Sequence, residues 1–343
     1  MLEIEDLDKR PLMGITMGDP CGIGPEVILK ALAREESYRV CKPLVIGHPE
    51  ILYRDMGMAG VRLDVRVVAQ PEDGAFEFGC VDVWCPVDVD VDVDQISMGK
   101  VCCEAGRAAA EWVIRAVDLA MADRIDGIVT APLNKEAMNL AGYPYAGHTE
   151  LLAEKSDAGR AHLMLVSDRM NVSHVTGHIA LHEVPDRLTV DLIYDTVRLT
   201  RDVLIGMGKL DPRVAVCGLN PHAGENGLFG SEDAEVVRPA VEKALSKGWR
   251  VDGPLPADTT FLKAYNGIYD GVVAMYHDQG HVPAKLVAFD EAVNVTLGLP
   301  IVRASVDHGT AYDIAGKGIA KAVNMLQAIR VGSKLAIFTS SPR

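Results

Sequence analysis

Short apolar runs that end near glycine, proline or asparagine recur along this chain of 343 residues. Runs of this length, apolar on both sides, are typical of buried strands in a largely parallel sheet. Helical patterns separate several of them, such as residues 99–123, with a long alanine-rich face, and residues 231–247. We therefore predict an α/β fold whose strands are LMGITM, KPLVIG, DGIVTAP, AHLMLVS, RVAVCGLNP, YDGVVAMY and KLAIFTS.

Length and charge limit the classes of protein and partner. A chain of this size is long enough for two domains. Its formal net charge is −14, from 48 acidic and 34 basic residues, which disfavours nucleic acid and anionic membranes as partners. The first residues, MLEIEDLDKR, lack the apolar core of a signal peptide, and no apolar run reaches the roughly 18 residues that span a bilayer. Seven cysteines without CxxC spacing indicate reduced thiols, and we expect a cytoplasmic protein.

Two segments have distinctive patterns without a clear chemical role. In PVDVDVDVDQIS, residues 86–97, valine and aspartate alternate, which predicts a half-exposed strand with one acidic face. A calcium loop is the alternative, but the glycine of an EF-hand is absent. The stretch TMGDPCGIGPE, residues 16–26, predicts a tight turn from strand to helix; it matches neither the dinucleotide fingerprint nor the phosphate-binding loop.

Polar residues at predicted helix starts and strand ends are candidates for anion binding. Lys135 lies near the head of a short helix, and His148 and Thr149 come where another helix begins. Such groups suit a phosphate or carboxylate, although Thr149 as a simple N-cap is the alternative. Further along, Lys285, Asn294 and Arg303 supply a cation, an amide and a fork of donors for anionic oxygens, with surface or loop-bracing roles as the alternative.

Histidines follow several predicted strands. In HVTGHIALH the spacing of four invites comparison with a zinc protease helix, but the glutamate of HExxH is missing and a strand followed by a loop is favoured. His222 and His277 also come directly after strands, and His178 makes a third imidazole. Three imidazoles with an open position describe a catalytic divalent-metal site, in which Asp278 could orient His277; structural histidines are the alternative.

Several motifs, in order, resemble those of the PdxA family. They are ITMGDPxGIGPE, TAPLNKEA, GHTELLA, NPHAGENGLFG, GPLPADTxF, AMYHDQGH and NVTLGLPxxRxSxDHGTAxDIAGKG, and they extend from about Met13 to about Ala328. The family comprises 4-hydroxythreonine-4-phosphate dehydrogenases and related D-threonate or D-erythronate 4-phosphate dehydrogenases. The Val-Asp repeat has no part in the resemblance.

The resemblance implies a three-layer α/β/α fold like that of isocitrate and isopropylmalate dehydrogenases, with two domains around a central cleft. It implies an NAD-binding domain at residues 1–145 plus 296–343, and a substrate, metal and dimerisation domain at 146–295. The protein would be a homodimer with a shared active site. Carried over motif by motif, the metal ligands are His178, His222 and His277, and the substrate contacts are His148, Thr149, Lys285, Asn294 and Arg303.

The implied reaction oxidises the C3 hydroxyl of a four-carbon 4-phosphorylated acid with NAD, or NADP as an alternative, and then releases CO2. A divalent ion (Zn, Mg, Mn or Co) would stabilise the developing alkoxide. The base remains open among Asp278, Lys135 and metal-bound water. The loop AGENGLFG, with Asn226, favours a threonate or erythronate phosphate over 4-hydroxythreonine 4-phosphate. Alternatives are a dehydrogenase of a carboxylated aromatic cis-dihydrodiol, an acyl-phosphate transferase, and a regulatory binding protein.

Overall fold

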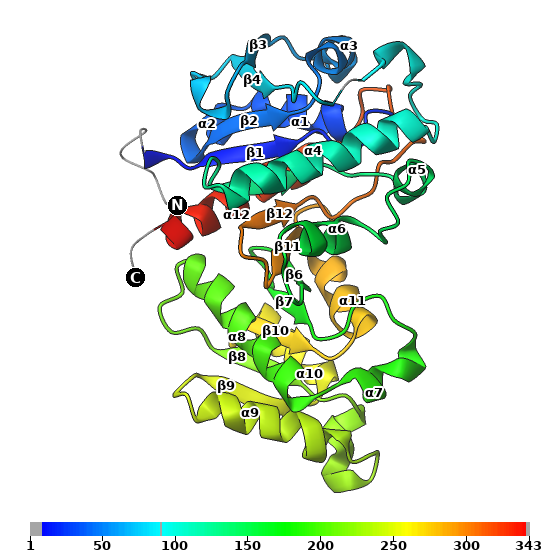
Figure 1. Ribbon diagram of the computed structural model, residues 1–343. Coiled ribbons are helices and arrows are strands. Elements are labelled where there is room, and N and C mark those ends of the chain that lie inside the picture. Colours follow the sequence, from blue (N-terminus) through cyan, green and yellow to red (C-terminus); the bar gives the residue numbers. More distant parts are fainter. Residues whose placement is uncertain (1–8, 90, 341–343) are drawn as a thin grey trace. The chain divides into compact units, whose positions relative to one another are not determined.

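A computed structural model describes residues 9–89 and 91–340. The chain forms two compact units, Met1–Ala161 with Leu299–Arg343, and His162–Gly298 (Figure 1). The division expected from the sequence assigned residues 146–161 to the second unit. In the structure they belong to the first, because helix α6 (His148–Lys155) packs against helix α4 (Cys103–Met121). The assignment of NAD binding to one unit and of substrate binding to the other remains a prediction.

The first unit contains a parallel sheet, as expected from the short apolar runs. Every pairing between the strands of this sheet is parallel in the described residues. Its strand order is β3 (Asp64–Val68), β4 (Cys80–Trp84), β2 (Lys42–Ile46), β1 (Leu12–Thr16), β5 (Gly127–Thr130) and β12 (Arg303–Ser305). The predicted α/β class is confirmed.

Helices cover both faces of this sheet. Helix α4 packs on β1 and β5, with the short helices α5 (Lys135–Leu140) and α6 beside it. Helix α12 (Val323–Ser340) packs on the other side of the same strands, next to α1 (Gly24–Leu32) and α2 (Glu35–Val40) (Figure 1). Helix α3 (Pro49–Ala59) and the turn η2 (Pro71–Asp73) complete the edge near β3.

The predicted strand KLAIFTS is wrong. These residues form the end of helix α12, and buried residues of that helix recur at helical spacing: Met325, Ala328, Ile329, Leu335 and Ala336. A short apolar run does not by itself separate a strand from one face of a helix, and here the residues before it continue the helical period.

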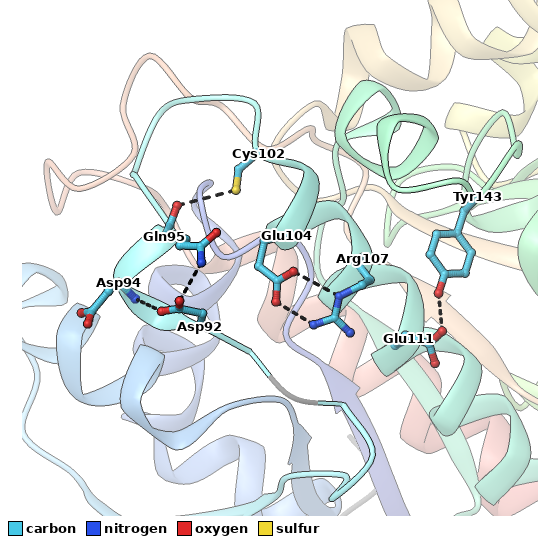
Figure 2. A network of polar contacts seen from close by, with 8 residues as sticks. All are labelled: Asp92, Asp94, Gln95, Cys102, Glu104, Arg107, Glu111 and Tyr143. Atoms are coloured by element: carbon cyan, nitrogen blue, oxygen red, sulfur yellow. Dashed lines mark hydrogen bonds and ion pairs between the residues drawn. The ribbon is translucent and has the colours of Figure 1, made fainter.

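The strand predicted for residues 86–97 is also wrong. This segment has turns and a short 3₁₀ helix, η3 (Val93–Gln95), without a strand partner in the described residues; Asp90 lies outside them. Figure 2 shows that Asp92 accepts hydrogen bonds from the backbone of Asp94, at 3.1 Å, and from the side chain of Gln95, at 2.7 Å. The alternation follows burial only in part: Val89 and Val91 are buried while Asp92 and Asp94 are exposed, but Val87 is exposed as well.

The glycine-rich turn at residues 16–26 joins β1 to α1, as expected. Gly18 adopts φ +70°, and a Cβ there would lie 2.4 Å from the carbonyl oxygen of Pro132, so only glycine fits. Asp19 is fully buried and accepts hydrogen bonds from the backbone N–H of Cys21, at 2.8 Å, and from the hydroxyl of Tyr312, at 2.5 Å. The turn is therefore braced against the loop that follows β12.

The second unit has a mixed sheet. Its strand order is β11 (Val293–Leu297), β6 (His162–Val166), β7 (Val172–His174), β10 (Gly271–Ala274), β8 (Val214–Cys217) and β9 (Val251–Leu255). Strands β7, β10, β8 and β9 run parallel, and β6 runs antiparallel to both of its neighbours.

This sheet also lies between two layers of helices. Helices α8 (Val190–Gly206) and α9 (Arg238–Leu245) pack on one face, and α10 (Ala257–Tyr265) and α11 (His277–Ala288) pack on β7, β10 and β8. Shorter elements are η4 (Leu181–Glu183), α7 (Val184–Arg187), η5 (Pro221–Gly227) and η6 (Asp233–Val237). Among the described residues, no helix is both long enough and apolar enough to cross a membrane.

Candidate active site

Three neighbouring parallel strands of the second unit end beside one another, and each leads into a predicted ligand histidine. Strand β10 lies between β7 and β8. The carboxyl ends of parallel strands meet at one edge of a sheet, which is where ligands bind in α/β proteins. His178 follows β7, His277 is the first residue of α11 after β10, and His222 lies in η5 after β8. The fold therefore directs all three segments to the same edge.

Hydrogen bonds connect the segments that follow these strands. Thr176 donates from its backbone N–H, at 3.2 Å, and from its hydroxyl, at 2.8 Å, to the carbonyl oxygen of Met275. The side chain of Gln279 accepts from the N–H of Met275, at 2.7 Å, and donates to the carbonyl of Gly218, at 2.8 Å. Gln279 was not among the predicted site residues, although it belongs to the HDQGH motif.

His277 is held by its neighbour. Its Nδ1 lies 2.7 Å from a carboxylate oxygen of Asp278, so this ring nitrogen is engaged and Nε2 remains for another partner. A carboxylate on the far nitrogen is the usual arrangement for a metal-binding imidazole. The ring of His178 lies beside that of His277, with centroids 5.2 Å apart. This pair is the part of the predicted histidine triad that one chain brings together.

His222 occupies a turn with unusual backbone geometry. Residues 222–226 all have positive φ, including His222 at 53° and Asn226 at 56°. Such angles cost of the order of 1 kcal/mol or more for each residue with a side chain, and they concentrate at functional sites. Asp233, a buried carboxylate, holds the turn by accepting from the N–H groups of Leu219, at 2.7 Å, and Asn220, at 3.0 Å.

The described residues of one chain do not complete a metal site. Within 9–89 and 91–340, no three histidine, cysteine, aspartate or glutamate side chains take ligand positions around one point. His222 instead lies beside Phe229, with ring centroids 6.3 Å apart. The donor set, three imidazoles with one oriented by a carboxylate, suits a divalent transition metal chemically. Two of the three donors are adjacent as that role requires.

Two further histidines lie against this pair and were not assigned a role from the sequence. His281 is one helical turn after His277, and their rings stack with centroids 3.7 Å apart. His174, at the end of β7, is buried, and its ring centroid is 4.5 Å from that of His281. The i, i+4 spacing of His277 and His281 was a signal for this contact, but it is visible only once the segment is known to be helical.

The first unit contains a separate group of predicted residues around Arg303, which begins β12. Arg303 is only 2% exposed, and it donates to the hydroxyl of Thr130 at 2.7 Å. Burial lowers its pKa to about 9, so the guanidinium remains charged at neutral pH. The pKa of His148 is well below its usual value, first because of burial and then because of the positive charges of Arg303 and Lys135.

This group suits an anion. His148 is half-buried, but its Nε2 is sealed from solvent and has no hydrogen-bond partner among the described residues. A neutral imidazole donor beside a buried guanidinium can bind carboxylate or phosphate oxygens. Lys135 begins α5, which Asn134 caps, and Thr149 lies in the first turn of α6. The N-cap alternative for Thr149 is wrong, because Gly147 occupies that position.

The other two predicted substrate contacts belong to the second unit. Lys285 lies in the last turn of α11, two turns after His277. Asn294 lies in β11, and its side-chain oxygen is sealed from solvent without a hydrogen-bond partner in the described part of the chain. A sealed amide oxygen of this kind is costly unless a ligand or water satisfies it.

Comparisons with known proteins give the family. The family model described as "Pyridoxal phosphate biosynthetic protein PdxA" matches residues 39–332. The chain belongs to the PdxA family. It is 49% identical to the 4-hydroxythreonine-4-phosphate dehydrogenase of Desulfosudis oleivorans over 327 residues, 94% of this chain and 95% of the relative. It is 46% identical to the D-threonate 4-phosphate dehydrogenase of Cupriavidus necator over 330 residues, 96% and 98% of the two chains.

A solved structure of the same family has the same fold. The crystal structure of 4-hydroxythreonine-4-phosphate dehydrogenase from Klebsiella pneumoniae is 41% identical, covers 95% of this chain and 99% of its own, and superposes with a TM-score of 0.85. This PdxA-family protein is therefore a dehydrogenase, an oxidoreductase that acts on a secondary alcohol with a nicotinamide cofactor.

Proposed function

We propose that this enzyme uses NAD and a divalent metal ion to oxidise the C3 hydroxyl of a four-carbon, 4-phosphorylated acid, which then loses CO2. The observation that carries the proposal is the shared edge of β7, β10 and β8, from which three segments present His178, His277 and His222. The buried guanidinium of Arg303, next to Thr130 and His148, supports an anionic substrate.

The three histidines would hold the metal. Zn, Mg, Mn and Co are all candidates, and the bound ion would act as a Lewis acid at the carbinol that is oxidised. Asp278 keeps the His277 ring in one orientation through the 2.7 Å contact with its Nδ1. This chain's own contribution is to fix two imidazoles side by side at the end of the sheet.

The substrate's anionic groups would be bound by the predicted substrate contacts. Arg303 and Lys285 would hold the carboxylate and phosphate, because a guanidinium fork and an ammonium suit these oxygens. His148 would donate from the nitrogen that has no partner in the described residues, and Thr149 and Asn294 would contribute a hydroxyl and an amide.

The reaction balances with these groups. The hydride leaves C3 for the nicotinamide, and the hydroxyl proton passes to a base, for which Asp278 and Lys135 are the candidates in this chain. The resulting β-keto acid releases CO2 and leaves its electron pair on the adjacent carbon as an enolate, which is then protonated.

We also propose a cytoplasmic homodimer in which the partner chain completes each active site. The described residues of one chain contain no complete group of three ligands, and this supports a site that needs a second copy. In the same proposal, the unit Met1–Ala161 with Leu299–Arg343 binds NAD.

NAD reduction with three substrates tests the proposal. We would offer the metal-loaded enzyme D-threonate 4-phosphate, D-erythronate 4-phosphate and 4-hydroxy-L-threonine 4-phosphate in parallel. We expect the highest kcat/KM with one of the two sugar acids, because the loop AGENGLFG, with Asn226, favours them. A lack of turnover with all three would contradict the proposed function.

A further inference from the structure

The loop at residues 141–147 leads directly into two predicted substrate contacts. It follows α5, and it is followed by His148 and Thr149, the first two residues of α6. A Cβ at Gly147, the last residue of the loop, would lie 3.6 Å from the Cε of Lys135, so the loop ends against that lysine. A shift of the loop would therefore move His148 and Thr149 relative to the rest of the anion-binding group.

The backbone hydrogen bonds of this loop are local. The N–H of Tyr143 donates to the carbonyl oxygen of Met138 at 3.1 Å, and the N–H of Tyr145 donates to the carbonyl oxygen of Tyr143 at 2.9 Å. The side-chain amide of Asn139, in α5, donates to the carbonyl oxygen of Tyr145 at 3.2 Å. Such bonds shape the loop and connect it to the end of α5. They do not hold it against the core of the unit, so that task falls to its side chains.

The side chain of Tyr143 connects the loop to helix α4. Its hydroxyl donates to one carboxylate oxygen of Glu111, as Figure 2 shows. The other oxygen of Glu111 lies 3.7 Å from the guanidinium of Arg115, one helical turn further along α4. Burial, and after it the hydrogen bond to Glu111, raise the pKa of Tyr143 to about 12, so the phenol keeps its proton at neutral pH. A neutral hydroxyl on a carboxylate is one of the stronger kinds of hydrogen bond.

Helix α4 is a firm support for this contact. It has 19 residues and packs on β1 and β5 of the sheet. Trp112, the neighbour of Glu111, is fully buried, as are Ala108 and Ala110. The carboxylate that receives the Tyr143 hydroxyl is therefore fixed to the core of the first unit.

We propose that Tyr143 and Glu111 are positioning residues of the substrate site, and that their hydrogen bond holds the loop so that His148 and Thr149 meet the anionic oxygens of the substrate. The proposal rests on the proposed function and deepens it, because it names what keeps these contacts in place. The hydrogen bond is present before the substrate binds. Its loss should therefore weaken ground state and transition state alike, which raises KM and leaves kcat nearly unchanged.

Kinetics of the metal-loaded enzyme test the proposal, with the best of the three phosphorylated acids as substrate. We expect Tyr143→Phe and Glu111→Leu each to raise KM by about tenfold, the effect of one lost hydrogen bond, with kcat within about twofold of wild type. Glu111→Gln should retain most of the wild-type KM, because its amide oxygen still accepts from the hydroxyl. The double variant Tyr143→Phe with Glu111→Leu should be no worse than either single variant, since both remove the same bond.

The matched control is Tyr145→Phe in the same loop. The Tyr145 hydroxyl donates to Glu154 of α6 at 2.7 Å, so this variant also removes a bond between a tyrosine and a glutamate but leaves the contact with α4 intact. Its KM should stay within about twofold of wild type. An unchanged KM in Tyr143→Phe, an equal rise in Tyr145→Phe, or a fall in kcat without a rise in KM would overturn the positioning role.

Amide hydrogen exchange, measured by mass spectrometry on the full-length enzyme, separates a failure of this inference from a failure of the proposed function. In Tyr143→Phe we expect faster exchange at residues 141–149 and unchanged exchange in α4. Unchanged exchange in the loop, or equally faster exchange throughout α4, would overturn the inference. A wild type that turns over none of the three acids would contradict the proposed function instead, and exchange would still decide whether Tyr143 holds the loop.

Discussion

His148 shows how one side chain links binding to stability. Its Nε2 is sealed from solvent beside the charges of Arg303 and Lys135, so a proton on this ring is disfavoured in the folded chain. The same features make the neutral ring a donor for an anionic ligand. The sequence indicated His148 as an anion contact through the GHTE motif. Its low pKa could not be predicted, because it depends on burial and on the charge of Arg303, which is 155 positions away in the chain.

We predict that His148→Asn changes how stability depends on pH. The folded pKa of His148 lies well below 6.5, and the unfolded value lies near 6.5, so below that pH the unfolded state binds a proton that the folded state does not. The contribution of the neutral His148 ring to the free energy of unfolding is fully present above pH 6.5 and is lost as pH falls. Relative to the variant, the free energy of unfolding of wild type should fall between about pH 7 and about pH 5, by at most about 1.4 kcal/mol per pH unit.

Urea unfolding of the ligand-free proteins, followed by circular dichroism, would measure this difference. Groups other than His148 are common to both proteins, so their titration cancels in the comparison. A difference in the free energy of unfolding that stays constant across this pH range would show that His148 titrates normally in the folded protein.

At the scale of elements, the contact between α4 and α5 depends on Gly106. A Cβ at this position would lie 2.2 Å from the backbone carbon and oxygen of Ala137 in α5. Gly106→Ala should therefore force the two helices apart and lower the free energy of unfolding by about 1–3 kcal/mol. The control is Gly57→Ala in α3, where nothing lies within 4 Å and alanine should stabilise the helix by about 0.5–1 kcal/mol.

Chemical denaturation of both variants would test this contact. Equal effects of the two substitutions would show that helix propensity dominates at residue 106, and would contradict the proposed close approach of α4 and α5.

The strand predictions were correct where a short apolar run contains or ends near glycine or proline. They were wrong where the local pattern of apolar residues fits a helix or a loop as well as a strand. LMGITM and YDGVVAMY became β1 and β10, whereas KLAIFTS became the end of α12. In residues 86–97 the alternation predicted burial correctly for Val89 and Val91 but not for Val87, and it did not predict the absence of a strand partner, which depends on distant segments. His281 was missed for a similar reason, since its contact with His174 joins α11 to β7.

At the scale of the whole molecule, the sequence motifs indicate candidate site residues but not how the fold groups them. Motifs along the chain indicated ten residues, which the fold distributes between two units. The net charge of −14 did not reveal the local positive charge at Arg303 and Lys135. Nor could spacing along one chain show that the described residues do not gather three ligand side chains around one point, because this depends on how distant segments fold.

We predict that α11 contributes to the proposed homodimer. Val282, Leu286 and Phe289 recur at helical spacing and are 64%, 84% and 73% exposed in one chain, and such apolar surface usually marks an interaction site. Leu286→Glu should therefore shift the protein to a monomer in light scattering and reduce activity. Leu210→Glu, at a 95% exposed leucine outside α11, is the control and should remain dimeric. An active wild-type monomer would contradict the proposed assembly.

The most direct test of the proposed reaction is the simultaneous measurement of NADH and CO2 during turnover of D-threonate 4-phosphate by the metal-loaded enzyme. Oxidation at C3 followed by decarboxylation predicts that the two products form in equal amounts, and that both are lost when the metal is removed by a chelator and return when it is restored. NADH without CO2, or equal rates with and without metal, would contradict the proposed oxidative decarboxylation.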